Sequence, residues 1–567
     1  MTYTPPIAEQ RFVLETVTRI AELATTERFA AASPDMVDAI LEGAGSFAHG
    51  EWGPLNWVGD QHGAQWNDGA VTMPPGFKEA YKAYVEGGWG SLDGPEAFGG
   101  QGLPFALATV VLEDLGTANM AFTLCPMLTV GAIEAIAQHG SDEQRDHYLP
   151  KLVTGEWTGT MNLTEPQAGS DVGALRTTAT LQGDGSFLIK GTKIYITFGE
   201  HDLAENIIHL VLARTPGAPA GTKGISLFLV PKIRPDGSRN DVHCVSIEHK
   251  LGIHASPTCV LAFGDDDACT GHLIGPEMGG IRAMFTMMNN ARLNVGLQGV
   301  EIGERATQTA IAYAAQRIQS ARAGGETAAS VAIIEHPDVR RTLMRMKALT
   351  QAARALLYYA AGQVDRAHLG VEGAKVRLDI LTPLAKSYGS DIGCEIASLG
   401  VQVHGGMGFV EETGAAQHYR DIRIAPIYEG TNGIQAADLV GRKLTGDGGA
   451  GLAALIADMR AEAQDDGLIA LINAIEGAAA HMLAASIDDR LAGSAPFLTM
   501  VSVAVCGWLL ERQMRIAATQ DSVFHKAKVA VAGYYLAHIV PEATGLAASA
   551  RAGAAGLYAL SAEEMAA

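Results

Sequence analysis

The carboxylate best placed to do chemistry is Glu429, in the segment Tyr428-Glu-Gly-Thr-Asn-Gly433. A helix is expected to begin just after it, over 434–444, and an acidic residue beside a helix N-terminus is a favourable partner of the helix dipole. The preceding residues 422–427 are largely apolar, and burial there would raise the pKa of the Glu429 carboxyl towards the range of a general base. Local chemistry alone leaves both interpretations open.

A second polar segment covers residues 161–173 and concentrates hydroxyls, an amide and flexible glycines. Closely spaced backbone N–H groups and hydroxyls can hydrogen-bond a heteroaromatic ring or a phosphate without adding charge, which suits a cofactor. A turn capped by Thr164 and Ser170 would explain the same residues.

The segment Gln402-Val-His-Gly-Gly-Met-Gly-Phe409 ends a long predicted helix in a glycine-rich bend, which is common at helix ends. Arg317, late in another helix, could be a helix-terminal cation or a phosphate clamp. The histidines lack the spacing of metal ligands, so metal catalysis is disfavoured and no metal site is predicted.

The elements that position these residues follow from hydrophobic periodicity. Residues 1–156 are expected to form an N-terminal helical domain, with helices over 105–115 and 127–137. Two glycine-rich interruptions, 51–75 and 99–102, are expected to be ordered loops.

Downstream, the period changes to two and then returns to that of a helix. The middle β domain, 157–278, should be a compact antiparallel sheet or barrel, with strands over 187–196, 207–212, 225–230 and 259–263. Residues 279–444 should form a four-helix bundle, 445–451 a linker, and 452–567 an additional C-terminal helical domain. The expected fold class is therefore α+β.

Composition limits the function classes. The 567 residues include 41 Lys and Arg against 62 Asp and Glu, a net charge of −21, which disfavours nucleic acid and anionic membrane surfaces as partners. The six cysteines show no C-x-x-C pair, which favours a reducing cytoplasm. Neither an export signal nor a run of about 20 uninterrupted apolar residues is evident.

Taken in this order, the motifs resemble those of the acyl-CoA dehydrogenase family over residues 30–445. The T-E-P-x-A-G-S-D-x-G signature stands at 164–173 and the Y-E-G-T signature at 428–431. The resemblance implies an N-terminal helical domain, a middle β domain and a four-helix domain, with FAD as cofactor. It also implies that Glu429 is the catalytic base, which removes the α-proton of an acyl-CoA while the β-hydrogen leaves as hydride.

The resemblance implies further site residues. The FAD contacts it implies are Leu163, Thr164, Gly169, Ser170, Ile196, Thr197, Arg317, Gln402, His404, Gly405, Gly406 and Thr431. The acyl-CoA contacts it implies are Ser170, Arg292, Tyr428 and Gly430, although Arg292 could equally form a plain helix salt bridge.

With its extra C-terminal domain, the chain resembles a long subgroup of the family. That likeness implies a methylthio-substituted acyl-CoA, of the kind formed in dimethylsulfoniopropionate breakdown, or a short straight-chain acyl-CoA. Electron-transfer flavoprotein is the implied electron acceptor, and a homodimer or dimer of dimers the implied assembly. An acyl-CoA oxidase, or a non-catalytic flavin-holding stress or nucleic-acid-binding protein, would use the same scaffold. The acidic residues of 452–567 disfavour nucleic-acid binding.

Overall fold

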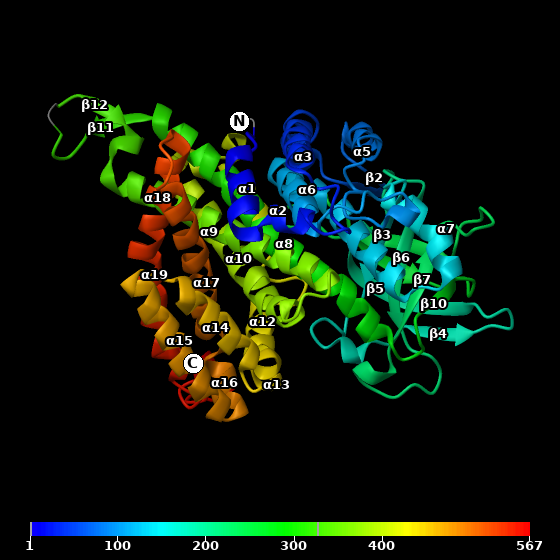
Figure 1. Cartoon of the computed structure of the whole chain (residues 1–567). Coiled ribbons are helices and arrows are strands. Elements are labelled where there is room, and N and C mark those ends of the chain that lie inside the picture. The colour runs from blue at the N-terminus through cyan, green and yellow to red at the C-terminus, as the bar shows by residue number, and fades with distance from the viewer. Residues whose placement is uncertain (1–2, 326–327) are drawn as a thin grey trace. The chain divides into compact units, whose positions relative to one another are not determined.

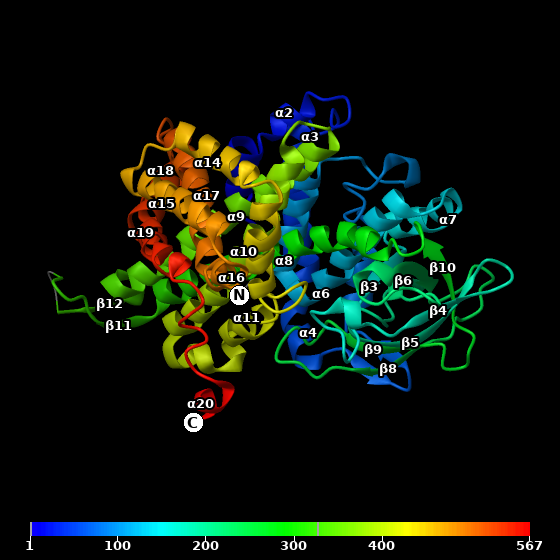
Figure 2. The same ribbon diagram turned by 90° about the horizontal axis from the view of Figure 1, so that it is seen from below.

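The computed structural model describes residues 3–325 and 328–567. The chain packs as two compact units, which we call the β unit (residues 43–291) and the helical unit (residues 3–42 and 292–567). Figures 1 and 2 show their elements from two directions. This division does not test the domain boundaries predicted from the sequence, which remain predictions.

The β unit begins with helices and a small hairpin. Its elements before the main sheet are α4 (Leu55–His62), β1 (Gln65–Asn67), β2 (Ala70–Thr72), α5 (Phe77–Glu86), α6 (Phe105–His139) and α7 (Asp142–Val153), while α3 (Pro34–Phe47) runs across the boundary with the helical unit. The expectation of a loop over 51–75 is wrong, because this stretch holds α4 and the hairpin. Tertiary contacts impose the hairpin: the Trp66 indole N–H donates to Cys244 O (2.9 Å), and Val71 is buried.

Helix α6 joins the two helices that the periodicity predicted separately. Its backbone is non-helical at Asn119 (φ −158°, ψ 87°), and the Asn119 side-chain oxygen accepts from Phe122 N (3.2 Å). The asparagine therefore caps the second half of the helix at the kink. The helix is apolar on nearly every side because almost all of it is buried.

The middle of the chain forms one eight-stranded sheet. Its strands are β3 (Trp157–Asn162), β4 (Thr178–Leu181), β5 (Phe187–Thr197), β6 (Asn206–Ala213), β7 (Ser226–Pro231), β8 (Val242–Ile247), β9 (Thr258–Phe263) and β10 (Thr270–Ile274). The strand order is β3-β6-β7-β10-β5-β9-β8, with β4 paired to β5.

The predicted β domain is confirmed, with one correction to its antiparallel pairing. Strands β3 and β6 pair in parallel, with Trp157 opposite Asn206. Parallel strands need a crossover of a dozen or more residues, and residues 163–205 supply it. The other strand pairs of this sheet are antiparallel.

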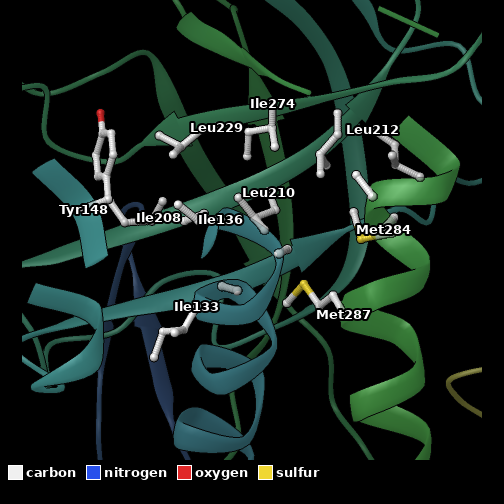
Figure 3. Packing of buried hydrophobic residues seen from close by; sticks show 14 of the residues in the cluster. Ile133, Ile136, Tyr148, Ile208, Leu210, Leu212, Leu229, Ile274, Met284 and Met287 are labelled. Carbon is white, nitrogen blue, oxygen red and sulfur yellow. The ribbon is translucent and has the colours of Figure 1, made fainter. Parts of the chain in front are cut away.

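The core of the β unit lies between this sheet and two helices. Figure 3 shows Ile133 and Ile136 of α6 beside the sheet residues Leu210 and Leu229, all of them buried. The first part of α8 (Gly280–Gln316) adds Met284 and Met287 to the same cluster. These contacts fix the helices that precede and follow the sheet.

The helical unit contains the predicted bundle. Its helices up to residue 446 are α1 (Ile7–Val13), α2 (Ile20–Ala24), the part of α8 from Arg292 onwards, α9 (Pro337–His368), α10 (Ala374–His404), α11 (Ala415–Ile422), α12 (Asn432–Asp438) and α13 (Leu444–Gly446). A π-helical turn, Leu439–Lys443, joins α12 to α13. The helices predicted for 279–444 are therefore confirmed, with the last one divided into these three short pieces.

The helices predicted for 452–567 are also present. They are α14 (Ala450–Glu462), α15 (Asp466–Ala484), α16 (Ile487–Ala492), α17 (Ser494–Ala517), α18 (Val523–Tyr534), α19 (Val540–Thr544) and α20 (Ala562–Ala566). Helix α17 is largely buried and packs against α9 and α10 of the bundle. Two polar contacts also join this C-terminal region to earlier helices: the Tyr535 hydroxyl lies 2.9 Å from that of Tyr388 on α10, and the buried Lys528 Nζ on α18 donates to Glu9 Oε1 on α1 (2.8 Å).

Three described helices are long and apolar enough to cross a membrane by length and composition: α6, α15 and α17. They qualify by mean hydropathy, although polar residues interrupt each of them, so that none contains a run of about 20 uninterrupted apolar residues. In α6 and α17, 83% of the most apolar window is buried inside the protein, which accounts for their composition; in α15 the share is 39%.

Candidate active site

Glu429 lies on a strained turn immediately before α12. Its φ is +55°, a left-handed conformation that non-glycine residues rarely adopt, and Gly430 follows with φ +83°. The Gln435 side-chain amide donates to the carbonyls of Glu429 (3.3 Å) and Gly430 (3.4 Å), while the Thr431 hydroxyl caps α12 by accepting from Ile434 N (3.2 Å). The turn is therefore held from its C-terminal side.

Burial raises the pKa of the Glu429 carboxyl to about 7, and the neighbouring charges of Arg292 and Lys386 limit that rise. Both cations are buried: Arg292 is 8% exposed and Lys386 0%. A carboxyl with this pKa is partly ionised near neutral pH and can accept a proton there, which is the property of a general base. The raised pKa that the sequence-based argument expects is present, and the catalytic role of Glu429 stays a prediction.

A close crossing of α8 and α10 places the two cations. A methyl group on Gly296 would lie 2.4 Å from Ala385 O, and one on Gly299 would lie 1.8 Å from Gly389 O. Only glycines let the helix backbones approach this closely. Arg292 on α8 and Lys386 on α10 both lie within two turns of this crossing.

The other residues predicted to contact substrate in the helical unit lie beside Glu429. The Tyr428 hydroxyl donates to Gln298 Oε1, and burial raises the pKa of this phenol. A Cβ added to Gly430 would lie 3.9 Å from Arg292 Nη2, so Arg292 faces this turn. Their roles as substrate contacts stay predictions, as does that of Ser170, which belongs to the β unit.

In the β unit, the signature segment and the end of β5 lie side by side. Ile194 N donates to Thr164 O (2.9 Å), and the Lys193 ammonium donates to Leu163 O (3.1 Å). Lys193 also forms a buried salt bridge with Glu165 (2.8 Å). The segment that follows β3 is therefore anchored to β5 through backbone and charge.

Glu165 organises the signature segment from inside. Burial alone would raise the pKa of its carboxyl, but the charge of Lys193 and hydrogen bonds from Lys193, Thr177 and Arg176 lower it to about 2. Burial lowers the pKa of Lys193 to about 8, against the charge of Glu165. The pair is thus ionised at neutral pH, and Glu165 serves structure rather than proton transfer.

The remaining predicted flavin contacts leave space for a ring. Leu163, Thr164 and Thr197 are half-buried, Ser170 is exposed, and a Cβ on Gly169 would meet no atom within 4 Å. Ile196 is 2% exposed, so its side chain belongs to the β core, whereas the neighbouring Tyr195 is 60% exposed. Hydroxyls, an unobstructed glycine and an exposed aromatic ring fit a bound heteroaromatic group.

The predicted nucleotide contacts lie at the ends of α8 and α10. His404 is buried and stacks on Tyr313 of α8, with ring centroids 4.4 Å apart, which brings the two ends together. Arg317 follows the last residue of α8, is exposed, and donates to Gln319 Oε1 (3.4 Å). Gln402, in the last turn of α10, is exposed, as are Gly405 and Gly406 just after the helix, where an added Cβ would meet no atom within 4 Å.

Sequence reasoning missed the buried charges behind both motifs. Lys386 lies behind the Glu429 turn and donates to the Asn432 amide, and Lys193 lies behind the signature segment and pairs with Glu165 of that segment. A lysine among mainly apolar residues, as at 380–388 and 187–196, does not by itself identify a buried charge: in the second run Lys193 is buried but Lys190 is exposed.

The sequence predicts no metal site, and the structure groups three possible ligands, Asp241, His243 and Asp266, within 4.8 Å of one another. The Asp241 carboxylate lies 2.9 Å from His243 Nε2 and accepts from Asp266 N (2.9 Å) and Ala268 N (3.0 Å). These hydrogen bonds explain the grouping without an ion.

Four family models match the chain in order. They are the N-terminal domain of acyl-CoA dehydrogenase over residues 55–156, its middle domain over 160–265, its C-terminal domain over 278–444, and the acetyl-CoA dehydrogenase C-terminal-like domain over 450–561.

Two curated relatives match nearly the whole chain. It is 46% identical to 3-methylmercaptopropionyl-CoA dehydrogenase of Ruegeria pomeroyi, covering 96% of this chain and 97% of the relative. It is 37% identical to a butyryl-CoA dehydrogenase of Syntrophomonas wolfei, covering 90% of each.

Among solved structures, butyryl-CoA dehydrogenase of Megasphaera elsdenii is 26% identical, with a TM-score of 0.61 over 72% of this chain and 98% of that one. An acyl-CoA dehydrogenase of Bacillus anthracis complexed with FAD is 24% identical, with a TM-score of 0.76 over 92% of this chain and 89% of that one. The second likeness speaks for the fold alone.

Proposed function

The chain belongs to the acyl-CoA dehydrogenase family, and from that premise we propose that it oxidises 3-methylmercaptopropionyl-CoA to the trans-2-enoyl-CoA, with Glu429 as the base. The family and the near-full-length relatives establish an acyl-CoA dehydrogenase. The observation that carries the role of Glu429 is its half-buried carboxyl on a strained turn, whose pKa burial raises to about 7 against the charges of two buried cations, Arg292 and Lys386.

The choice of substrate rests on the relative that is 46% identical over almost the full length of both chains and is named for that acyl-CoA. A short straight-chain acyl-CoA such as butyryl-CoA is the second candidate, supported by the 37% identical butyryl-CoA dehydrogenase. Both have the CH₂–CH₂ unit next to the thioester on which this reaction acts.

The first task of the protein is to remove an α-proton of the thioester. The Glu429 carboxylate accepts this proton, and its low-dielectric surroundings make it a stronger base than an exposed glutamate. Arg292 and Lys386 oppose the effect of burial, so that a useful fraction of the carboxyl remains ionised at neutral pH.

The second task is to stabilise the negative charge that develops on the thioester oxygen. Across residues 3–325 and 328–567, the Glu429 backbone N–H has no hydrogen-bond acceptor within the protein. It can donate to the thioester oxygen, where a fixed dipole needs no rearrangement as charge develops. Because this N–H belongs to the same residue as the base, the donor lies close to the site of proton removal.

When bound, FAD, the cofactor of this family, would supply the acceptor for the β-hydrogen, which leaves the substrate as hydride. In the β unit, Leu163, Thr164, Ser170 and Thr197 would hold its ring, with Gly169 allowing a close approach. In the helical unit, the nucleotide half would be held by Gln402, His404, Gly405, Gly406 and Arg317, with Thr431 beside the base.

Three further features of the function are proposals from the same premise. Electron-transfer flavoprotein reoxidises the enzyme, and the chain assembles as a homodimer or dimer of dimers. The cytoplasm is its compartment, in keeping with six cysteines that are all described and all free.

The test is a comparison of kcat/KM for three acyl-CoAs with an artificial electron acceptor. 3-Methylmercaptopropionyl-CoA should exceed butyryl-CoA by about tenfold or more, the range of a well-fitted extra group. Pentanoyl-CoA, which replaces the sulfur by a methylene, is the control that separates chain length from recognition of sulfur. Preference for butyryl-CoA would reject the substrate, and rapid stoichiometric peroxide in air without an acceptor would identify an oxidase instead.

A further inference from the structure

Lys386 is a buried cation that the reaction described above does not use directly. Its side chain on α10 is completely buried, and its ammonium donates to Asn432 Oδ1 at 2.8 Å. Within residues 3–325 and 328–567, no carboxylate lies within salt-bridge distance of this ammonium. Burying a lysine on a neutral amide is costly, so its position calls for a function.

The partner of Lys386 connects it to the base. Asn432 is the first residue of α12, three positions after Glu429. Its amide nitrogen donates to Asp391 Oδ1 (2.7 Å), Ser390 Oγ (3.0 Å) and Ser387 O (3.2 Å), so both ends of the amide are bonded to α10. The Asn432 backbone N–H donates to Pro426 O (3.0 Å), which closes the loop that contains Glu429.

This clamp acts where the backbone is strained. Glu429 and Gly430 both have positive φ, and such conformations persist only when the surrounding structure enforces them. Gln435 holds the two carbonyls from within α12, whereas Asn432 fixes the start of α12 to a neighbouring helix. The orientation of the base therefore depends on α10.

The charged groups around Glu429 come from α8, α10, α12, the π-helical turn after α12 and the segment that precedes Glu429. Arg292 on α8 and Lys386 on α10 act on its carboxyl directly. Asp391 acts on Lys386, and Asp438 and Arg442 act on Arg292. Arg423, before the turn, acts on Asp391. Lys386 is thus one of two cations that favour the ionised base.

We propose that Lys386 is a positioning residue for the base, which clamps the Glu429 turn through Asn432 and supplies, with Arg292, the positive charge that keeps the carboxylate ionised. This inference rests on the proposed role of Glu429. The two effects can be separated by mutation. Replacing Asn432 removes only the hydrogen bonds that hold the turn, whereas replacing Lys386 removes both a hydrogen bond to Asn432 and the positive charge.

The experiment measures the pH dependence of flavin reduction in the FAD-loaded, full-length enzyme mixed with 3-methylmercaptopropionyl-CoA in the absence of oxygen. Lys386→Met should move the midpoint of the rising limb to higher pH by about one unit, since it removes a neighbouring positive charge. The matched control is Lys443→Met, which removes a partly buried lysine that pairs with Asp379 on α10 (2.6 Å) and should leave the midpoint unchanged.

Asn432→Ala keeps the charge and removes the clamp. It should lower the plateau rate by about tenfold or more, as a misplaced catalytic group does, with the midpoint near its native value. If Lys386→Met does not bind flavin, Asn432→Ala alone tests the inference. A lowered plateau rate at an unchanged midpoint would support it, and a native pH profile would overturn it. A native midpoint in folded Lys386→Met also overturns it.

Glu429→Gln, measured alongside, separates this inference from the proposed function. A Glu429→Gln enzyme that reduces its flavin at the native rate would mean that the base itself is wrongly assigned. An inactive Glu429→Gln enzyme together with a native profile for Lys386→Met would reject only the role of Lys386.

Discussion

Gly299 of α8 and Gly389 of α10 cross backbone against backbone, so that a methyl group on Gly299 would lie 1.8 Å from the Gly389 carbonyl oxygen. The crossing holds the helix that carries Arg292 against the helix that carries Lys386. Because backbone atoms meet backbone atoms, no side-chain movement can make room for a larger residue.

Gly299→Ala should therefore destabilise the helical unit by about 3 kcal/mol or more, at or beyond the upper end for overpacking. Thermal unfolding monitored by circular dichroism measures the effect. Gly477→Ala is the matched control, because Gly477 lies within α15 with no atom within 4 Å of an added Cβ, and alanine is the better helix former. Equal unfolding temperatures for the two variants would contradict the crossing.

Breaking the buried Lys193–Glu165 pair should lower the stability of the protein far more than breaking an exposed pair on the same strand. Lys193→Met leaves the Glu165 carboxylate buried without its cation, which costs about 3–5 kcal/mol, and it should also release the signature segment and weaken flavin retention. The control is Lys190→Met, which breaks the exposed Lys190–Asp267 pair and should change stability little.

Flavin content after gel filtration and the unfolding midpoint measure these two effects. Similar losses in both lysine variants would show that burial does not set the strength of the pair.

The rate of flavin reduction should rise with pH through a midpoint of about 7. Burial raises the pKa of Glu429 to about 7, and only the carboxylate can accept the α-proton, so activity is lost as pH falls below this value. Stopped-flow measurement of flavin absorbance at saturating acyl-CoA, across pH 5.5 to 9, gives the profile. A rate that is constant from pH 5.5 upwards would place the base in an ordinary, exposed environment.

The sequence carries much of the fold because the two hydrophobic periods are long and clear. These periods predict the strands that the structure shows at 187–197 and 206–213, and they predict the helices of the bundle. The region 51–75 does not, because its hairpin depends on contacts such as Trp66 with Cys244, far away in sequence. The parallel pairing of β3 with β6 likewise depends on tertiary contacts, which the sequence pattern does not show.

For the site, local chemistry identifies Glu429 as a carboxylate that burial could make basic, and the structure supplies that burial. The sequence does not predict that Lys386 lies near Glu429 or that Asn432 holds the turn, because both depend on how α10 packs against the turn. A buried lysine is recognisable in a sequence only once its helix is known to be enclosed on every side.

The most direct test of the central claim is flavin reduction by Glu429→Gln. The amide cannot take up the α-proton, so the variant should retain FAD and bind 3-methylmercaptopropionyl-CoA, but its flavin bleaching should slow by about 10²–10⁴-fold, which is the contribution of a general base. Glu411→Gln, which changes an exposed glutamate paired with Arg420, is the control and should bleach normally. A Glu429→Gln enzyme that bleaches at the native rate would contradict the assignment of the base.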